Sequence, residues 1–287
     1  MSRLEQQQIL EFVDKLPGFS PAALKIISLA NNPNTSPTEL VNAISMDPML
    51  TAKMLKLVNS AYFGSRGVAS LNRAVMLLGF NTVKNISLSL AVVGGIRVRG
   101  EFKWFTNDQF WEHCLACAIV TKSLAKKMNV GALEVEEFFV AGLVHDMGLA
   151  ALIQKMPKEM GDIYDPSYQP ERPRHNVEKE MLGFSHPELS GLIARRWKFP
   201  PSLVAAIEHH HDPLAAPEEH RRLAAAVHLA DSGCHSLKIG IQTEINIGNI
   251  TKEELAAAGL EPDQVEESLV GLPEAVEGAR FFLEKVD

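Results

Sequence analysis

Apolar residues recur three and four positions apart through most of the sequence, and this spacing restricts the fold more than any other feature. The segment from Ala22 to Ala30 shows the spacing first and stops at an Asn-Asn-Pro-Asn sequence. Residues at this spacing share one face of an α-helix. Alternation typical of a strand occurs at 239–247, where Gly240 and Gly248 favour an extended loop instead. We therefore expect an all-α fold.

Residues that favour helix ends mark the individual helices. Ser36, Pro37 and Glu39 form a capping-box pattern with proline at the first helical position. Asp47 and Pro48 repeat the start of that pattern. Similar signals predict helices at about 71–78, 82–93, 107–128, 134–144, 221–237, 251–258 and 273–285, and others that begin near residues 177, 187 and 201.

The helical pattern divides into two lobes that meet near residues 95–107. Gly94 and Gly95 are expected to end one helix, and a turn-rich stretch follows to Thr106. We predict an N-terminal helical lobe at 1–106, a second helical lobe at 107–235 and a C-terminal helical extension at 236–287. In the second lobe, the helix at 134–144 should end in a turn at 146–148.

Composition excludes several classes of protein. The 287 residues carry a net charge of -7, so no basic field favours nucleic acid, and the short basic run at 195–198 is interpreted as a solvated helix end. Three cysteines are too few for a disulfide framework and fit a reducing compartment. The sequence shows no signal peptide and no apolar run of membrane-spanning length. We expect a cytoplasmic protein that is not inserted in a membrane.

His145 and Asp146 are the strongest indication of chemistry. They follow a helix of apolar residues, Phe138 to Val144. Polar groups at the end of a core helix are costly unless another group satisfies them. A divalent metal would satisfy them, because imidazole nitrogen and carboxylate oxygen suit zinc, iron, manganese or nickel. The two oxygens of Asp146 also suit it to bridge two ions.

Five further candidate ligands are less telling one by one. His113 has apolar neighbours on its helix, which is also typical of a hydrogen-bonded core histidine. His186 begins a helix, His210 and His211 belong to a run of three histidines that cannot all face one way, and Asp231 lies in an alanine-rich helix. The ordered set is His113, His145, Asp146, His186, His210, His211 and Asp231.

This ordered set resembles the ligand series of the HD superfamily of metal-dependent phosphohydrolases over about residues 107–235, and the second lobe is accordingly HD-like. A second resemblance, to the HDOD family, covers about residues 14–213. The segments that carry it are 16–24, 44–51, 57–64, 74–80, 183–188 and 206–213. HDOD proteins are HD-related output domains that act in bacterial signal transduction and have usually lost catalytic residues.

The resemblance implies a regulatory protein that binds metal and contacts a protein partner. The alternative is an active phosphohydrolase acting on a nucleotide or another phosphoester. In that case Asp146 would be the catalytic bridging residue, and Lys122 is a candidate phosphate contact. No Gly-Tyr-Pro follows His211, which departs from the HD-GYP branch. Gln109 stands where some HD-GYP sites have a glutamate for a third metal, so two ions are expected.

Other motifs are interpreted as structural. Cys114 and Cys117 form a CxxC pattern in the middle of a predicted helix without a partner pair, which favours small buried residues over a zinc or redox site. A nucleic-acid-binding module would rest on the helical first lobe alone, and the net charge argues against it.

Overall fold

The computed structural model describes residues 21–30, 32, 34–59, 67–95, 98, 102, 104–131, 134–165, 167–168, 172–241, 250–280 and 283. Every regular element among these residues is helical, which confirms the all-α prediction. The helices of the first part are α2 (Pro21–Ala30), α3 (Pro37–Ser45), α4 (Pro48–Val58), α5 (Leu71–Leu78) and α6 (Phe80–Gly95). Those that follow are α7 (Asn107–Lys127), α8 (Val135–Val144), α9 (Met147–Lys155), α10 (Pro157–Ile163), α11 (Arg174–Leu182), α12 (His186–Arg196), α13 (Pro201–Glu208), the 3-10 turn η1 (Pro213–Ala215), α14 (Glu218–Ser236), α15 (Lys252–Ala258), α16 (Pro262–Leu269) and α17 (Leu272–Ala279).

The helix starts predicted at Ser36 and Asp47 are confirmed. The hydroxyl of Ser36 accepts a hydrogen bond from the backbone of Glu39, whose carboxylate accepts one from the backbone of Ser36. Asp47 accepts hydrogen bonds from two backbone N–H groups at the start of α4. These bonds satisfy donors that the first helical turn leaves unpaired.

The helix predicted at 82–93 is longer at both ends, which corrects two expectations. Gly79 adopts a positive φ of 84°, and α6 begins directly after it, before the predicted cap at Asn81. Gly94 and Gly95 lie in the last turn of α6 and do not break it. Packing of α6 against α2, α4 and α8 offsets the weak helix propensity of these glycines, which is about 1 kcal/mol each.

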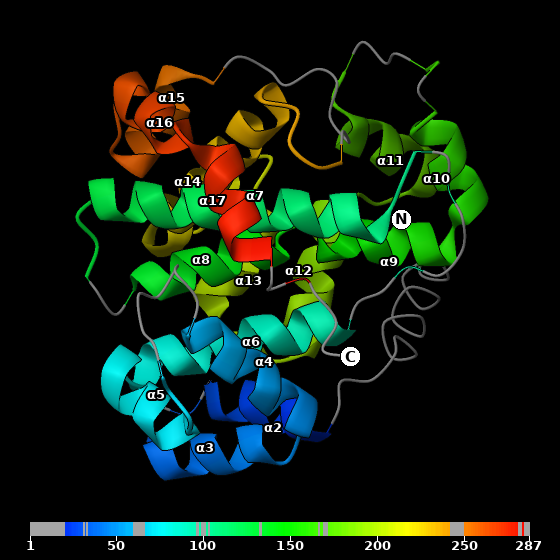
Figure 1. Ribbon diagram of the computed structural model, residues 1–287. Coiled ribbons are helices and arrows are strands. Elements are labelled where there is room, and N and C mark those ends of the chain that lie inside the picture. The colour runs from blue at the N-terminus through cyan, green and yellow to red at the C-terminus, as the bar shows by residue number, and fades with distance from the viewer. Residues whose placement is uncertain are drawn as a thin grey trace.

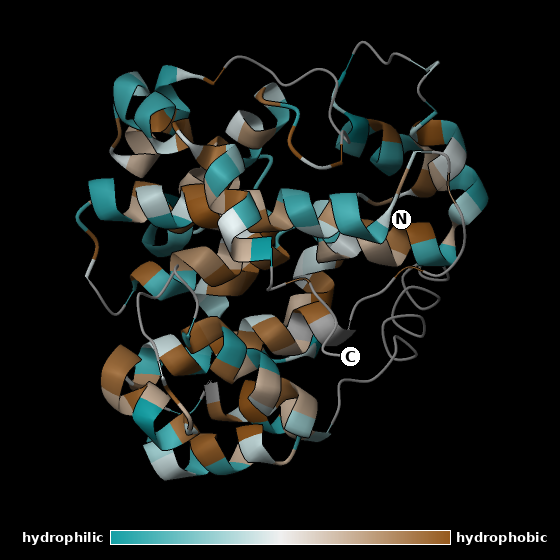
Figure 2. Ribbon diagram, viewed as in Figure 1, coloured by the Kyte–Doolittle hydropathy of each residue, from teal (hydrophilic) through white to brown (hydrophobic). Residues whose placement is uncertain are grey.

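Helix α6 also joins the two halves of the molecule. Helices α2 to α5 pack on one another and on α6, which in turn contacts α8 (Figure 1). The buried apolar residues of both halves form one continuous core. Figure 2 shows apolar stretches gathered where α6 and α8 face each other. The boundaries proposed at residues 106 and 235 remain predictions.

The long helix α7 lies at the centre of the second half. It packs against α8 and α14, and α14 contacts α13, which contacts α12 (Figure 1). Helix α12 also packs on α9. This arrangement places helices that are far apart in the sequence beside one another.

Three helices of the second half were not predicted from the sequence. The turn expected at 146–148 is present at its start, but Met147 already begins α9, whose buried side chains include Leu149 and Leu152. Helices α10 and α16 are short and were not predicted. In the C-terminal extension, α15, α16 and α17 pack against α7 or α14. None of the helices in the described ranges is both long enough and apolar enough to cross a membrane.

Candidate metal centre

The turn between α8 and α9 places His145 and Asp146 in the interior. His145 is fully buried and Asp146 is 3% exposed. The Nδ1–H of His145 donates to the carbonyl of Gly142 at 2.8 Å. That bond fixes the tautomer and turns Nε2 of His145 away from its own helix, toward the carboxylate of Asp146. The closest approach is 3.5 Å, from Nε2 to Oδ2 of Asp146.

The first ligand group consists of His113 in α7, His145 directly after α8, and Asp231 in α14. Nε2 of His113 lies 3.0 Å from Oδ1 of Asp231. Nε2 of His145 lies 3.7 Å from the same oxygen. All three side chains are buried, so the α7–α14 packing brings together residues that are 118 positions apart in the sequence.

The second ligand group consists of His186, His210 and His211. His186 begins α12, and the other two follow α13. Nε2 of His186 lies 3.1 Å from Nε2 of His211. The Nδ1–H of His210 donates to the carbonyl of Ile207 at 2.7 Å, which leaves its Nε2 facing the cluster. The third member of the run, His209, belongs to neither group.

Asp146 lies between the two groups. Its Oδ2 faces His145, whereas its Oδ1 lies 3.3 Å from Nε2 of His186 and 3.5 Å from Nε2 of His210. Each oxygen of one carboxylate therefore faces a different ligand group. All seven residues predicted from the sequence come together in one cluster.

The residues of the cluster shift one another's pKa values. Burial alone would raise the pKa of Asp146 and of Asp231, but the surrounding histidines outweigh it and hold both values well below the usual range. Burial would lower the pKa of His145, but the two aspartates raise it to about 9. Burial and the neighbouring histidines lower the pKa of His211, and burial does the same for His210.

Besides Nδ1 of His113, three atoms of the cluster have no hydrogen bond although they are buried. They are Nε2 of His145, Nε2 of His210 and Oδ1 of Asp146. Leaving such atoms unsatisfied is costly, and these three point at one another. A cation would satisfy all of them at once. The nitrogen and carboxylate donors fit a divalent transition metal, so these buried groups can hold one.

Three residues that sequence analysis missed support the cluster. The carboxylate of Glu178 accepts a hydrogen bond from Nδ1 of His186 at 2.8 Å. Nε2 of His235 lies 3.3 Å from Oδ1 of Asp231. The sulfur of Cys117 lies 3.5 Å from Nε2 of His113. His235 and Cys117 each stand four residues after a predicted ligand on the same helix, a spacing that places side chains on one face.

Two glycines allow the helices to approach closely enough to form the cluster. A Cβ atom on Gly142 would lie 2.8 Å from the carbonyl oxygen of Cys117, where α8 meets α7. A Cβ atom on Gly148 would lie 2.2 Å from the carbonyl oxygen of His186, where α9 meets α12. Both contacts are with backbone, so no side-chain movement relieves them.

Lys122, the predicted phosphate contact, has other partners. Its Nζ lies 2.7 Å from Oε1 of Glu136 and 5.7 Å from the centre of the Phe139 ring. A carboxylate thus already compensates this cation, and its role toward phosphate stays a prediction.

The fold and the cluster together define an all-helical protein with buried histidine and aspartate groups that can hold metal. The chain belongs to the HDOD family, because the family model of the HDOD domain matches residues 16–213. This confirms the resemblance seen in the sequence.

Solved structures and a curated protein resemble this chain in fold or in sequence. A Geobacter sulfurreducens HDOD domain protein of unknown function superposes with a TM-score of 0.76 at 22% identity, over 96% of each chain. A proposed phosphohydrolase of Shewanella amazonensis SB2B has a TM-score of 0.70 at 26% identity, again over 96% of each chain. An uncharacterised protein of Treponema pallidum (strain Nichols) is 28% identical over 227 residues, which are 78% of this chain and 43% of that protein. The chain thus spans less than half the length of this curated relative.

Proposed function

We propose that the chain is a cytoplasmic regulatory protein that binds two divalent metal ions and transmits a signal through contacts with a protein partner. The observation that carries the proposal is the place of Asp146 between two ligand groups, one oxygen toward each. Iron, manganese, zinc and nickel all accept such nitrogen and oxygen ligands. His113, His145 and Asp231 would hold the first ion, and His186, His210 and His211 the second, with Asp146 shared.

The burial of the ligands favours a regulatory role over turnover. Six of the seven side chains are at most 4% exposed, and His211 is the most open at 12%. Catalytic metal sites keep a coordination position open to substrate, whereas structural sites are closed. These ligands come from five separate parts of the helical framework, so metal binding would stabilise the packing of the whole second half. A partner that recognises this packed state would sense the metal.

The second candidate is a metal-dependent phosphohydrolase acting on a nucleotide or phosphoester. It is favoured by the shared carboxylate of Asp146 and by the 26% identity to the proposed phosphohydrolase of Shewanella amazonensis. A pair of metal ions would supply an activated water and bind phosphate oxygens. Asp146 would then orient both ions, and the partly exposed His211 would lie on the side from which substrate arrives.

The metal content of untagged protein, measured by mass spectrometry, tests the shared proposal. About two equivalents of metal in the wild type, lost in Asp146→Ala, are expected. No stoichiometric metal after reconstitution would overturn both candidates. Assays of the metal-loaded protein on a broad phosphoester panel then separate them. No turnover supports the regulatory protein, whereas turnover that Asp146→Ala abolishes without unfolding supports the enzyme.

A further inference from the structure

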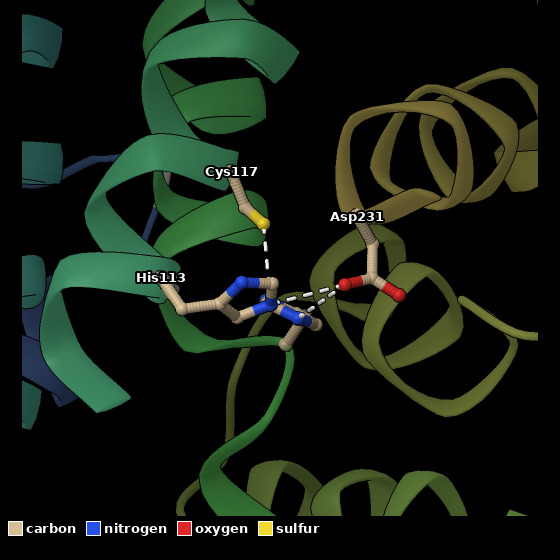
Figure 3. A group of neighbouring side chains, drawn as sticks. His113, Cys117 and Asp231 are labelled. Atoms are coloured by element: carbon tan, nitrogen blue, oxygen red, sulfur yellow. Dashed lines mark hydrogen bonds and ion pairs between the residues drawn. The ribbon is translucent and has the colours of Figure 1, made fainter. Parts of the chain in front are cut away.

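The sulfur of Cys117 lies among the donor atoms of the first ligand group. The sulfur and the carboxylate of Asp231 both point toward the ring of His113 (Figure 3). One donor atom from each of His113, Cys117, His145 and Asp231 lies within 4.8 Å of all the others, and all four residues are buried. Nε2 of His145 has no hydrogen bond there, so the group contains an unsatisfied buried atom directed into it.

We propose that Cys117 is a thiolate ligand of the first metal ion, which makes the two metal positions chemically different. The inference rests on the proposed metal centre. In a metal site with bonds of about 2.0–2.3 Å, neighbouring ligand atoms are about 3–4 Å apart. The sulfur lies 3.5 Å from Nε2 of His113, which lies 3.0 Å from Oδ1 of Asp231. Nε2 of His145 completes the set at 3.7 Å from that oxygen. All three distances are in the range expected for ligand atoms that share one ion, and the remaining pairs lie within 4.8 Å.

A thiolate would give the first position a softer donor set than the second. The first would have two imidazoles, the carboxylate of Asp231, the shared Oδ2 of Asp146 and one sulfur, whereas the second would have three imidazoles and Oδ1 of Asp146. Sulfur favours zinc and other thiophilic ions over manganese or magnesium. The first position is therefore expected to retain zinc in competition with manganese, and the second to discriminate less.

The thiol is protonated in the metal-free protein. Burial, followed by the neighbouring Cys234, raises the pKa of Cys117 well above its ordinary value. A coordinated metal removes that proton outright. On binding, the S–H bond breaks, a metal–sulfur bond forms and the proton passes to solvent. Without metal, Cys117 is a buried thiol beside His113, consistent with its apolar surroundings on α7.

Cobalt(II) substitution of the full-length protein tests the ligand directly. Cobalt bound to thiolate gives an intense sulfur-to-metal charge-transfer band in the near ultraviolet, which nitrogen and oxygen ligands do not give. We expect this band in cobalt-loaded wild type and its loss in Cys117→Ser. Cys114→Ser is the matched control, because Cys114 is equally buried on the same helix but outside the ligand group, and it should keep the band.

The outcomes separate this inference from the proposed function. Cobalt that binds to the wild type without the band overturns the thiolate and leaves the metal centre standing. A band that survives in Cys117→Ser, or disappears in Cys114→Ser, also overturns it. If no cobalt binds to the wild type, the metal centre itself is wrong. Cys117→Ala provides a second variant should the serine variant fail to fold.

Discussion

Glu178 fixes the orientation of His186. Its carboxylate accepts hydrogen bonds from Nδ1 of His186 at 2.8 Å and from the backbone N–H of the same residue at 2.7 Å. The hydroxyl of Tyr164 donates to it at 2.6 Å. Glu178 is fully buried, and its bonds turn Nε2 of His186 toward Asp146. A carboxylate behind a ligand histidine is a common support for metal sites.

Replacing Glu178 with glutamine should weaken metal binding without unfolding the protein. A glutamine keeps the shape but offers one acceptor oxygen to three donors. Loss of such a supporting carboxylate typically lowers metal affinity about 10- to 100-fold. Competition with a chelator would measure the affinity. Glu180→Gln on the same helix is the control, because Glu180 is exposed and pairs with Arg172. Equal affinity in the two variants would contradict the supporting role.

Removal of metal should lower the melting temperature. An ion present at about 100 times its dissociation constant stabilises the folded state by about 2.7 kcal/mol. For a chain of this size that corresponds to about 5–10 °C. Calorimetry before and after chelation, with zinc added back, measures the shift. Asp146→Ala should show no shift, since its two ligand oxygens are absent. An unchanged melting temperature in the chelated wild type would count against the centre.

Metal affinity should increase with pH. The pKa of His145 is raised from 6.5 to about 9 by the two aspartates in the metal-free protein, so the proton on His145 stabilises that state fully below pH 6.5 and ceases to do so as the pH rises through 9. Metal binding must displace that proton, so the affinity should rise about tenfold per pH unit over this window for each proton released. Titrations at pH 7 and 8, in buffers of different ionisation enthalpy, would count the protons. Equal affinity at both pH values would exclude the displacement.

The parts of the molecule that local chemistry determines are predictable from the sequence. Ser36 and Asp47 begin helices because their side chains satisfy backbone donors within three residues. Helix α9 was not predicted because Gly148 is typical of a turn. In the structure, Gly148 instead allows a close contact with α12. The extension of α6 through Gly95 likewise depends on packing that no local pattern reveals.

In the candidate site, too, some residues are predictable from the sequence and others only from the structure. The seven candidate ligands form an ordered series in the sequence that resembles that of a known family. Cys117 and His235 follow His113 and Asp231 by four residues, a spacing that a search along each predicted helix would have detected. Glu178 reaches His186 only because the chain turns back between α11 and α12, where Gly183 adopts a positive φ. The contact between Glu178 and His186 could therefore be found only from the structure.

The approach of α9 to α12 provides the most stringent test of how the site is built. The backbone N–H of Gly148 donates to the hydroxyl of Ser190 at 2.8 Å, and a Cβ atom on Gly148 would lie 2.2 Å from the carbonyl oxygen of His186. Gly148→Ala must therefore move α9 away from α12 and separate Asp146 from His186. Such overpacking should lower the free energy of unfolding by about 1–3 kcal/mol. Metal should be lost first from the second ligand group.

Gly278→Ala is the matched control for this substitution. Gly278 lies in α17, and a Cβ atom there would meet nothing within 4 Å. Alanine in an open helical position should raise the free energy of unfolding by about 0.5–1 kcal/mol and leave metal binding unchanged. Urea unfolding and metal stoichiometry would be measured on both variants. If Gly148→Ala kept two metal ions and wild-type stability, the close contact between α9 and α12 would not be what positions Asp146 beside His186.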